Sequence, residues 1–128
     1  MIAGIGVDIV ETARVQRLAA KFGERFARRI LTEDELREFN RRRQSGSFLA
    51  TRFAAKEATA KALGTGIGEQ FGFHSVQVEH NDNGKPLLKF LDNGLELITR
   101  RKIRQAMISL SDEKNYAVAM VVLESQDG

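Results

Sequence analysis

The order of apolar and polar residues predicts helices in the first half of the chain and strands in the second. Residues 1–10 are rich in Ile and Val and predict a strand, which two glycines loosen. Residues 12–22 predict a helix, for which Thr12 is a candidate N-cap and Gly23 marks an end or a bend. The chain therefore begins with a strand that leads directly into a helix.

Two further helices are predicted in the middle of the chain. Residues 32–35, with the sequence Thr-Glu-Asp-Glu, have the pattern of a capping box at the start of the first of them. A polar break at residues 44–47 separates this helix from an alanine-rich one, which is expected from about residue 48 to residue 63 and ends at the glycines of residues 64–66. The sequence thus predicts one long alanine-rich helix beside shorter ones.

The second half of the chain alternates in the manner of antiparallel strands. An Asn83-Gly84 pair predicts a tight hairpin turn between the first two strands, and a polar turn at residues 112–115 joins the last two. Helices followed by such strands predict an α+β fold, a mostly antiparallel sheet packed against helices, in a single domain over residues 1–128. The strands are expected at residues 75–80, 87–91, 106–111 and 116–124, with a short helix around residues 94–101.

The run from Ala117 to Leu123 is apolar at every position, which predicts a strand that is buried on both faces. A chain of 128 residues can rarely cover both faces of a strand by itself. Part of this strand is therefore expected to line a contact between subunits.

Composition and charge are those of a soluble globular protein, with 42% hydrophobic residues, 29% charged residues and a formal net charge of +3. No apolar run approaches the roughly 20 residues that cross a bilayer, and the first residues lack the pattern of a signal peptide. The absence of cysteine excludes disulfides, thiolate metal sites and a cysteine nucleophile. We therefore expect a cytoplasmic protein that has no membrane segment.

Asp8 lies within an apolar strand, where a carboxylate is costly to bury unless it is paired or binds a metal ion. The alternative is that Asp8 lies at the end of the strand and caps the helix that begins near Thr12. From this residue alone, the two interpretations are about equally good.

The alanine-rich helix has charged residues on two different edges. Arg52 and Lys56 share one edge, and Glu57 and Lys61 share another. An ordinary surface ion pair would explain Glu57 and Lys61. Taken alone, this account is the better one; the apolar residues on both sides of the helix weaken it, because they leave the charged groups few directions in which to point.

Glycines at positions 64, 66 and 68 follow this helix and resemble a loop whose backbone amides bind phosphate. Helix termination is the commoner use of such glycines. The two histidines, His74 and His80, have no metal-type partner three or four residues away, so we assign neither a catalytic role.

Basic residues are concentrated near the predicted first helix. If that helix continued past Gly23, its basic side chains would lie within a sector of roughly 80°. A solvated basic face is the usual explanation of such a pattern, but almost no acidic residue shares this sector, which supports the alternative that an acidic partner docks there. The residues concerned are Arg14, Arg17, Lys21, Arg25 and Arg28.

Together these segments resemble the holo-[acyl-carrier-protein] synthase family of phosphopantetheinyl transferases, over nearly the whole chain and in the right order. The most specific of them are Gly-Val-Asp at residues 6–8 and Phe-Ala-Ala-Lys-Glu at residues 53–57. The matching segments are residues 4–11, 52–58, 64–68, 83–86, 109–112 and 116–117.

The resemblance implies a phosphopantetheinyl transferase-like fold and transfer of the phosphopantetheine arm of coenzyme A to a serine of acyl carrier protein, which leaves adenosine 3′,5′-bisphosphate. It also implies a need for Mg²⁺ and a homotrimer with an active site at each subunit interface. Asp8 and Glu57 match the metal ligands, Glu57 is the candidate base for the carrier serine, and Lys61 is expected to offset charge on the phosphorus. The resemblance assigns Arg52, Lys56, Gly64 and Gly66 to coenzyme A, and Arg14, Lys21 and Arg25 to the carrier protein.

One position departs from the family pattern. Many relatives have His where this chain has Asp112, and an Asp cannot offer a positive charge to a phosphate. Asp112 is therefore left without a role, and Arg52, Lys56 or another basic group is expected to compensate.

Two other classes of function compete with the transferase. A non-catalytic nucleotide or nucleic-acid-binding module would suit a pI near 9.5, but only 7% of the residues are aromatic and none is Trp, so base-stacking platforms are scarce. We therefore expect no nucleic-acid partner. A structural homo-oligomer would explain the alanine-rich helix as a packing surface.

Overall fold

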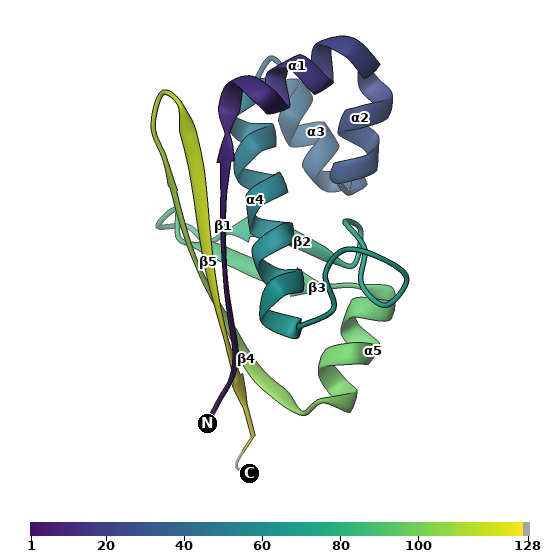
Figure 1. Ribbon diagram of the computed structural model, residues 1–128, viewed down its shortest axis with the longest axis vertical. Coiled ribbons are helices and arrows are strands. Elements are labelled where there is room, and N and C mark those ends of the chain that lie inside the picture. The colour runs from purple at the N-terminus through teal and green to yellow at the C-terminus, as the bar shows by residue number, and fades with distance from the viewer. Residues whose placement is uncertain (127–128) are drawn as a thin grey trace.

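The structure is a computed structural model, and it describes residues 1–126. In chain order its elements are β1 (Ile2–Glu11), α1 (Thr12–Phe22), α2 (Glu24–Ile30), α3 (Glu33–Arg41), α4 (Gly46–Leu63), β2 (Val76–His80), β3 (Pro86–Phe90), α5 (Asp92–Arg100), β4 (Ile103–Asp112) and β5 (Tyr116–Ser125). Helices α1, α2 and α3 gather at one end of the molecule, α5 lies at the other, and α4 runs between them along the strands (Figure 1). These helices and antiparallel strands confirm the predicted α+β class.

The strands form two antiparallel sheets. Strands β1, β5 and β4 make a three-stranded sheet in that order, and β2 pairs with β3 as a hairpin. On the inner face of β5, Ala117, Ala119, Val121 and Leu123 are buried, and this strand packs against α4. On the outer face, Met120 is 49% exposed. The prediction that this strand is buried on both faces is therefore wrong for the single chain, because α4 covers one face only.

Two glycines of β1 allow the strand to lie directly against α4. A Cβ atom at Gly6 would lie 2.1 Å from the carbonyl oxygen of Ala58, and one at Gly4 would lie 2.0 Å from that of Ala62. Because these contacts are with backbone atoms, a larger residue at either position would push the strand away from the helix. Residues two apart on a strand face the same side, so this contact also directs Asp8 toward α4.

Most helix boundaries follow the local sequence signals, and the start of α1 at Thr12 is the exception. Gly23 ends α1 with a φ of 63°, so α1 and α2 are two helices and not one continuous helix. The predicted capping box is confirmed, because the Thr32 hydroxyl accepts from the N–H of Glu35 and the Thr32 N–H donates to the Glu35 carboxylate. Thr12, predicted as an N-cap, is instead the first residue of α1, where its N–H donates to the carbonyl oxygen of Asn115.

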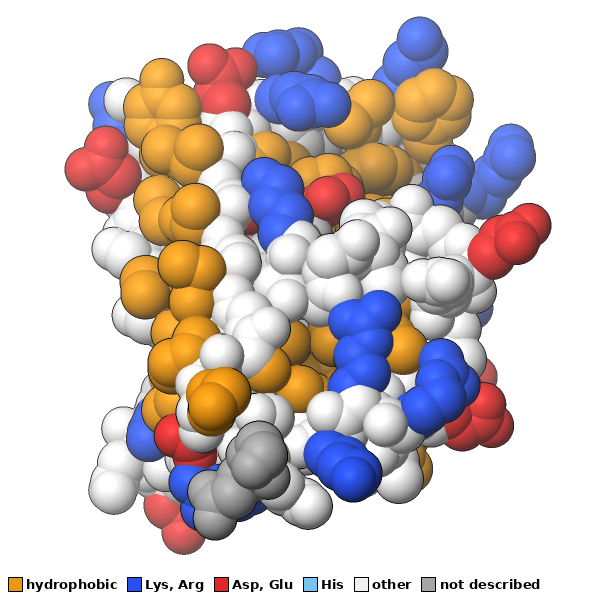
Figure 2. Space-filling model, turned by 60° about the horizontal axis from the view of Figure 1, so that its bottom comes forward, with side chains coloured by type: hydrophobic (Ala, Val, Ile, Leu, Met, Phe, Trp, Pro, Cys, Tyr) orange, Lys and Arg blue, Asp and Glu red, His pale blue; other side chains and the backbone are white. Residues whose placement is uncertain are grey.

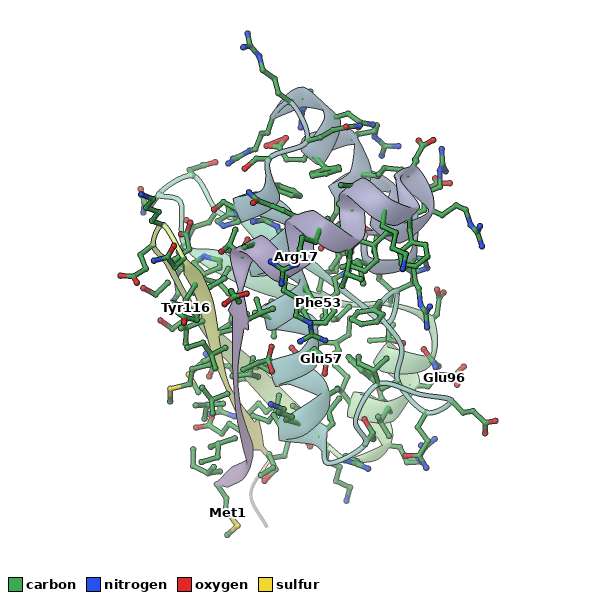
Figure 3. The ribbon with its side chains drawn as sticks, turned by 45° about the horizontal axis from the view of Figure 1, so that its top comes forward. Met1, Arg17, Phe53, Glu57, Glu96 and Tyr116 are labelled. Carbon is green, nitrogen blue, oxygen red and sulfur yellow. The ribbon has the colours of Figure 1, made fainter. Side chains whose placement is uncertain are left out.

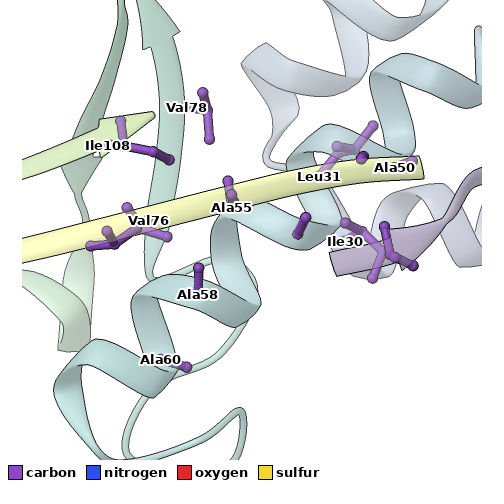
Figure 4. Close-up of a cluster of buried hydrophobic side chains, with 14 of the residues drawn as sticks. Ile30, Leu31, Ala50, Ala55, Ala58, Ala60, Val76, Val78 and Ile108 are labelled. Carbon is purple, nitrogen blue, oxygen red and sulfur yellow. The ribbon is translucent and has the colours of Figure 1, made fainter. Parts of the chain in front are cut away.

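Helix α4 lies at the centre of the core, with 18 residues. Its alanines are buried and allow strands and helices to approach closely: Figure 4 shows Ala55 and Ala58 among Ile30 of α2, Val76 of β2 and Ile108 of β4. Within residues 1–126, no helix combines the length and the apolar character that crossing a bilayer requires.

Candidate active site

An aspartate of β1 and a glutamate of α4 lie close together beside an exposed lysine. The Nζ atom of Lys61 donates to Oδ1 of Asp8 at 3.0 Å and to the carbonyl oxygen of Val7 at 3.1 Å. The Asp8 side chain is only 14% exposed. Glu57 lies four residues before Lys61 on the same helix and is labelled below Phe53 in Figure 3. The β1–α4 contact therefore gathers three charged groups that are far apart in the sequence.

The environment of Glu57 favours a bound cation. Burial is the main cause that raises the pKa of Glu57, and the negative charge of Asp8 raises it further, while Lys61 and Arg14 act in the opposite direction. The two carboxylates are thus close enough to repel each other, and a cation between them would relieve this repulsion.

These donors fit a magnesium ion. Mg²⁺ is a hard cation that binds one or two protein carboxylates and takes its other ligands from water and substrate phosphate. Asp8 and Glu57 offer that donor set. Residues 1–126 contain no group of three or more His, Cys, Asp or Glu side chains placed to hold a metal ion, so the arrangement does not resemble a closed structural zinc site.

A cavity of roughly 530 Å³ lies where the start of α4 meets the end of α3 and the turn between β2 and β3. Arg52 lines it and is 7% exposed, and the Arg52 Nε atom has no hydrogen-bond partner among residues 1–126. Its guanidinium carbon lies 3.9 Å from the centroid of the Phe48 ring, and Nη1 donates to the Thr51 hydroxyl at 3.0 Å. Burial is the main cause that lowers the pKa of Arg52 to about 10. A buried guanidinium with an unused N–H favours an anion such as phosphate.

The structure separates Arg52 from the carboxylates. Residues five apart on a helix differ in direction by roughly 140°, and neither Asp8, Glu57 nor Lys61 lines the cavity that Arg52 lines. A ligand that contacts both sites must extend along α4 or lie between two subunits. Asp8, Glu57 and Lys61 therefore form one site, and Arg52 belongs to another.

Lys56 does not line either site, and its assignment to coenzyme A is corrected. Its side chain is completely buried, and Nζ donates to the Glu35 carboxylate at 2.5 Å and to the carbonyl oxygens of Ile30 and Phe73 at 2.7 and 2.8 Å. An ammonium group has three hydrogens, and all three are used. Lys56 therefore holds α4 against the segments around it and has no donor left for a phosphate.

The glycines after α4 also serve the fold. Gly64 adopts a left-handed conformation and caps the helix, and its N–H donates to the carbonyl oxygen of Lys61. The N–H of Gly66 donates to the carbonyl oxygen of Ala60. Because these amides are used inside the chain, the predicted phosphate cradle at Gly64 and Gly66 is replaced by helix termination.

The basic residues assigned to the carrier protein are exposed. Arg14 and Lys21 lie on α1, and Arg25 lies on α2 beyond the break at Gly23. Arg14 is close enough to Glu57 for its charge to lower the pKa of that carboxyl. The basic surface therefore adjoins the Asp8–Glu57 site, although it does not lie along a single helix.

Two residues of the cavity wall were not anticipated from the sequence. Arg42 lies at the end of α3, in the run Arg41-Arg42-Arg43, and that run could have suggested an anion site. The hydroxyl of Ser47 donates to the Asp112 carboxylate at 2.6 Å. Asp112 thus has a structural partner on the cavity wall, and its negative charge is met by a hydrogen bond.

Known proteins resemble this chain along almost its whole length. Residues 4–121 match the model of the family described as 4′-phosphopantetheinyl transferase superfamily. A curated protein named holo-[acyl-carrier-protein] synthase, from Vibrio cholerae, is 50% identical over 124 residues, which cover 97% of this chain and 98% of that protein.

Two solved structures share the fold. The crystal structure of a holo-[acyl-carrier-protein] synthase from Neisseria meningitidis matches with a TM-score of 0.93 and 43% identity, over 98% of this chain and 100% of that one. A holo-(acyl-carrier-protein) synthase from Bacillus anthracis, solved in complex with CoA (3′,5′-ADP), matches with a TM-score of 0.82 and 40% identity, over 98% and 99% of the two chains.

Proposed function

This chain belongs to the 4′-phosphopantetheinyl transferase superfamily, and we propose that it transfers the 4′-phosphopantetheine arm of coenzyme A to a serine of apo acyl carrier protein. The products are holo carrier protein and adenosine 3′,5′-bisphosphate, and the reaction supports fatty acid biosynthesis in the cytoplasm. The observation that carries the proposal is the Asp8–Glu57 pair with Lys61 beside it, in a chain that is 50% identical to a named synthase. A nucleic-acid-binding module is not favoured by any of these observations.

In the proposed reaction the serine oxygen bonds to the phosphorus next to pantetheine, and the bond from that phosphorus to the bridging oxygen of the pyrophosphate breaks. Such transfers depend on positioning and on neutralising charge on the phosphoryl oxygens. Glu57 accepts the serine proton as a positioned general base. Lys61 offsets the charge that develops on the phosphoryl group. Asp8 and Glu57 would hold Mg²⁺, which when bound supplies neutralisation of the pyrophosphate.

One assay tests this function directly. The purified chain is incubated with coenzyme A, Mg²⁺ and apo acyl carrier protein, and the carrier is then weighed by mass spectrometry. We expect a mass gain equal to the phosphopantetheine arm, and loss of that gain when Mg²⁺ is chelated. A carrier of unchanged mass at saturating coenzyme A would exclude the transferase and leave the binding-module or structural alternatives.

The outer face of the three-stranded sheet supports self-association into the proposed homotrimer. Apolar side chains form an exposed ridge there, which runs along the left of Figure 2. Strand pairing places Val7 beside Met120, so β1 and β5 both contribute. Large exposed apolar patches mark protein contacts, and closed symmetry repeats such a contact in each subunit. The exposed residues are Ile2, Ile5, Val7, Ile9, Met107, Tyr116 and Met120.

A trimer also explains how one coenzyme A molecule contacts both sites. The proposed active site combines Asp8 and Glu57 of one subunit with Arg52 of its neighbour, whose cavity receives the 3′-phosphate. In this arrangement the Asp8→Ala and Arg52→Ala variants are each inactive alone. After subunit exchange, some interfaces carry intact Asp8 and intact Arg52, so we expect activity to return in part.

The mixing experiment needs two checks. Thermal melts establish that both variants are folded, and native mass spectrometry with one isotope-labelled variant establishes that subunits have exchanged. Mixed oligomers that stay as inactive as the separate variants would contradict the shared site, and so would a fully active monomer.

The basic surface of α1 and α2 is the proposed docking site for the acidic carrier protein. Charge reversal by Lys21→Glu together with Arg25→Glu should raise the KM for the carrier about tenfold and flatten its dependence on salt, because surface charges mainly steer association. The KM for coenzyme A should change less than about twofold, since steering acts on the carrier. Lys21 and Arg25 suit this test better than Arg14, whose charge also acts on Glu57.

The matched control is Arg100→Glu, which reverses a charge on α5. It should leave the KM for the carrier at the parent value. An equal loss of coenzyme A affinity in the Lys21/Arg25 variant would instead assign these residues to the nucleotide site.

A further inference from the structure

The cavity that Arg52 lines brings together side chains that can hold positive charge, each from a different element. Arg42 comes from the end of α3, Arg52 from α4, and His80 from the last position of β2. The guanidinium carbons of Arg42 and Arg52 lie 5.6 and 3.9 Å from the centroid of the same Phe48 ring. Two cations are thus held against one aromatic ring, and His80 lines the same cavity.

We propose that His80 is a third cationic ligand in this cavity, and that it binds the 3′-phosphate of coenzyme A together with Arg42 and Arg52. The inference rests on the proposed function, because it takes coenzyme A as the ligand. It adds a residue to which the sequence assigned no role, and it names the group of the ligand that this residue recognises.

The geometry supports an anion here. Arg52 is nearly fully buried with an unused Nε donor, which leaves a buried N–H without an acceptor in the part of the chain that the structure describes. A phosphate monoester offers several acceptor oxygens and up to two negative charges, enough for two guanidinium groups and one imidazolium. His80 is exposed, so its ring can meet a ligand that enters from solvent.

Two acidic residues beside the cavity, Glu38 and Asp112, already have ion-pair or hydrogen-bond partners within the chain. The Glu38 carboxylate is bound by Arg41 and Arg42, and their hydrogen bonds and charges lower the pKa of Glu38. Asp112 accepts from Ser47. These partners reduce the repulsion that a phosphate would meet. The other charged residues on this side line the adjoining hollow and are Asp34, Glu35 and Glu79.

The charges around His80 couple the binding of phosphate to protonation of the His80 imidazole. The part of the His80 ring that faces the cavity is shielded from water, and this partial burial is the main cause that lowers the pKa of His80; the charges of Arg52 and Arg42 lower it further, while Glu38 opposes them. A bound phosphate brings negative charge and so raises the pKa of the imidazole. A group whose pKa rises on binding takes up a proton, and its contribution to affinity grows as pH falls. His80 should therefore matter little at pH 8 and more at pH 6.

The test compares coenzyme A with dephospho-coenzyme A, which lacks the 3′-phosphate. Calorimetry gives the Kd of each ligand for the parent and for His80→Gln at pH 6, 7 and 8. The phosphate of free coenzyme A itself titrates near pH 6, but both proteins meet the same free ligand, so this titration cancels in the ratio of their Kd values. For coenzyme A, we expect His80→Gln to bind within about twofold of the parent at pH 8 and about three- to tenfold more weakly at pH 6. For dephospho-coenzyme A, the ratio should stay near one.

The matched control is His74→Gln, which removes the other histidine. The His74 ring lies 2.7 Å from the carbonyl oxygen of Arg28, away from this cavity, so this variant should follow the parent at every pH. A ratio for His80→Gln that does not change with pH, or an equal loss with dephospho-coenzyme A, would overturn the inference. Normal carrier modification with a flat ratio would overturn only the role of His80, whereas a parent that binds no coenzyme A at any pH would overturn the proposed function as well.

Discussion

Replacement of Glu57 by glutamine is expected to lower the rate of phosphopantetheine transfer by about 10²- to 10⁴-fold, the usual contribution of a positioned general base. Glutamine has nearly the same shape as glutamate, but it cannot accept the serine proton and it is a poor ligand for Mg²⁺. Asp8→Asn should cause a comparable loss, because Asp8 is the other ligand of the proposed cation. Initial rates at saturating coenzyme A, carrier and Mg²⁺ measure the effect.

The same substitution should not weaken the fold at neutral pH. Burial and Asp8 raise the pKa of Glu57, so the folded chain disfavours the charged carboxylate. This penalty is absent below the ordinary pKa near 4.5 and is fully present above the raised pKa. In buffer without Mg²⁺, Glu57→Gln should therefore melt at the same temperature as the parent or higher at pH 7, and the difference should vanish as the pH falls toward 4.

Two results would contradict this role for Glu57. Activity within about tenfold of the parent at saturating Mg²⁺ is too high for the loss of a general base. A lower melting temperature at pH 7 would indicate that Glu57 supports the fold. The control is Glu96→Gln on α5, which removes an exposed carboxylate that Figure 3 labels far from Glu57, and it should keep the parent rate.

Local signals in the sequence were sufficient for most elements. The capping box at Thr32 and the Asn83-Gly84 turn are each formed by a few neighbouring residues, so their physics is present in the sequence itself. The split at Gly23 was only partly anticipated, because the residues after it have helical character and only the backbone conformation of the glycine separates α1 from α2. The outward face of β5 was assigned wrongly, because an apolar run does not reveal whether the second face meets another element or another chain.

The site could be assembled from the sequence only through the family resemblance. Nothing in the spacing connects Asp8 with Glu57, because their proximity depends on Gly6 lying against the backbone of Ala58. The assignment of Lys56 to coenzyme A was wrong because helix periodicity describes one helix and not its neighbours. Periodicity places Lys56 on the same edge of the helix as Arg52, but it cannot show that Glu35 of another helix meets that edge.

That buried ion pair leads to the second large effect. Lys56→Met should lower the free energy of unfolding by about 3–5 kcal/mol, because it leaves the Glu35 carboxylate buried without its cation. Urea denaturation at neutral pH measures this change. Lys61→Met makes the same chemical change on the same helix, at an exposed lysine, and should cost at most about 1 kcal/mol. Equal stabilities of the two variants would show that the buried pair does not support the fold.

The double variant Lys56→Met with Glu35→Gln separates a structural role from a role in binding. Glu35→Gln removes the buried charge that Lys56→Met leaves without a cation, although one amide oxygen can accept from only one of the two N–H groups, of Thr32 and Val78, that the Glu35 carboxylate now binds. We therefore expect the double variant to recover about 0.5–3 kcal/mol relative to the sum of the single changes. Because Lys56 has no donor left for a ligand, the folded double variant should keep the parent KM for coenzyme A. If the folded double variant instead had a KM for coenzyme A about tenfold or more above the parent value, Lys56 would be shown to bind the phosphate. The loss of one charge-assisted hydrogen bond weakens binding by about that factor.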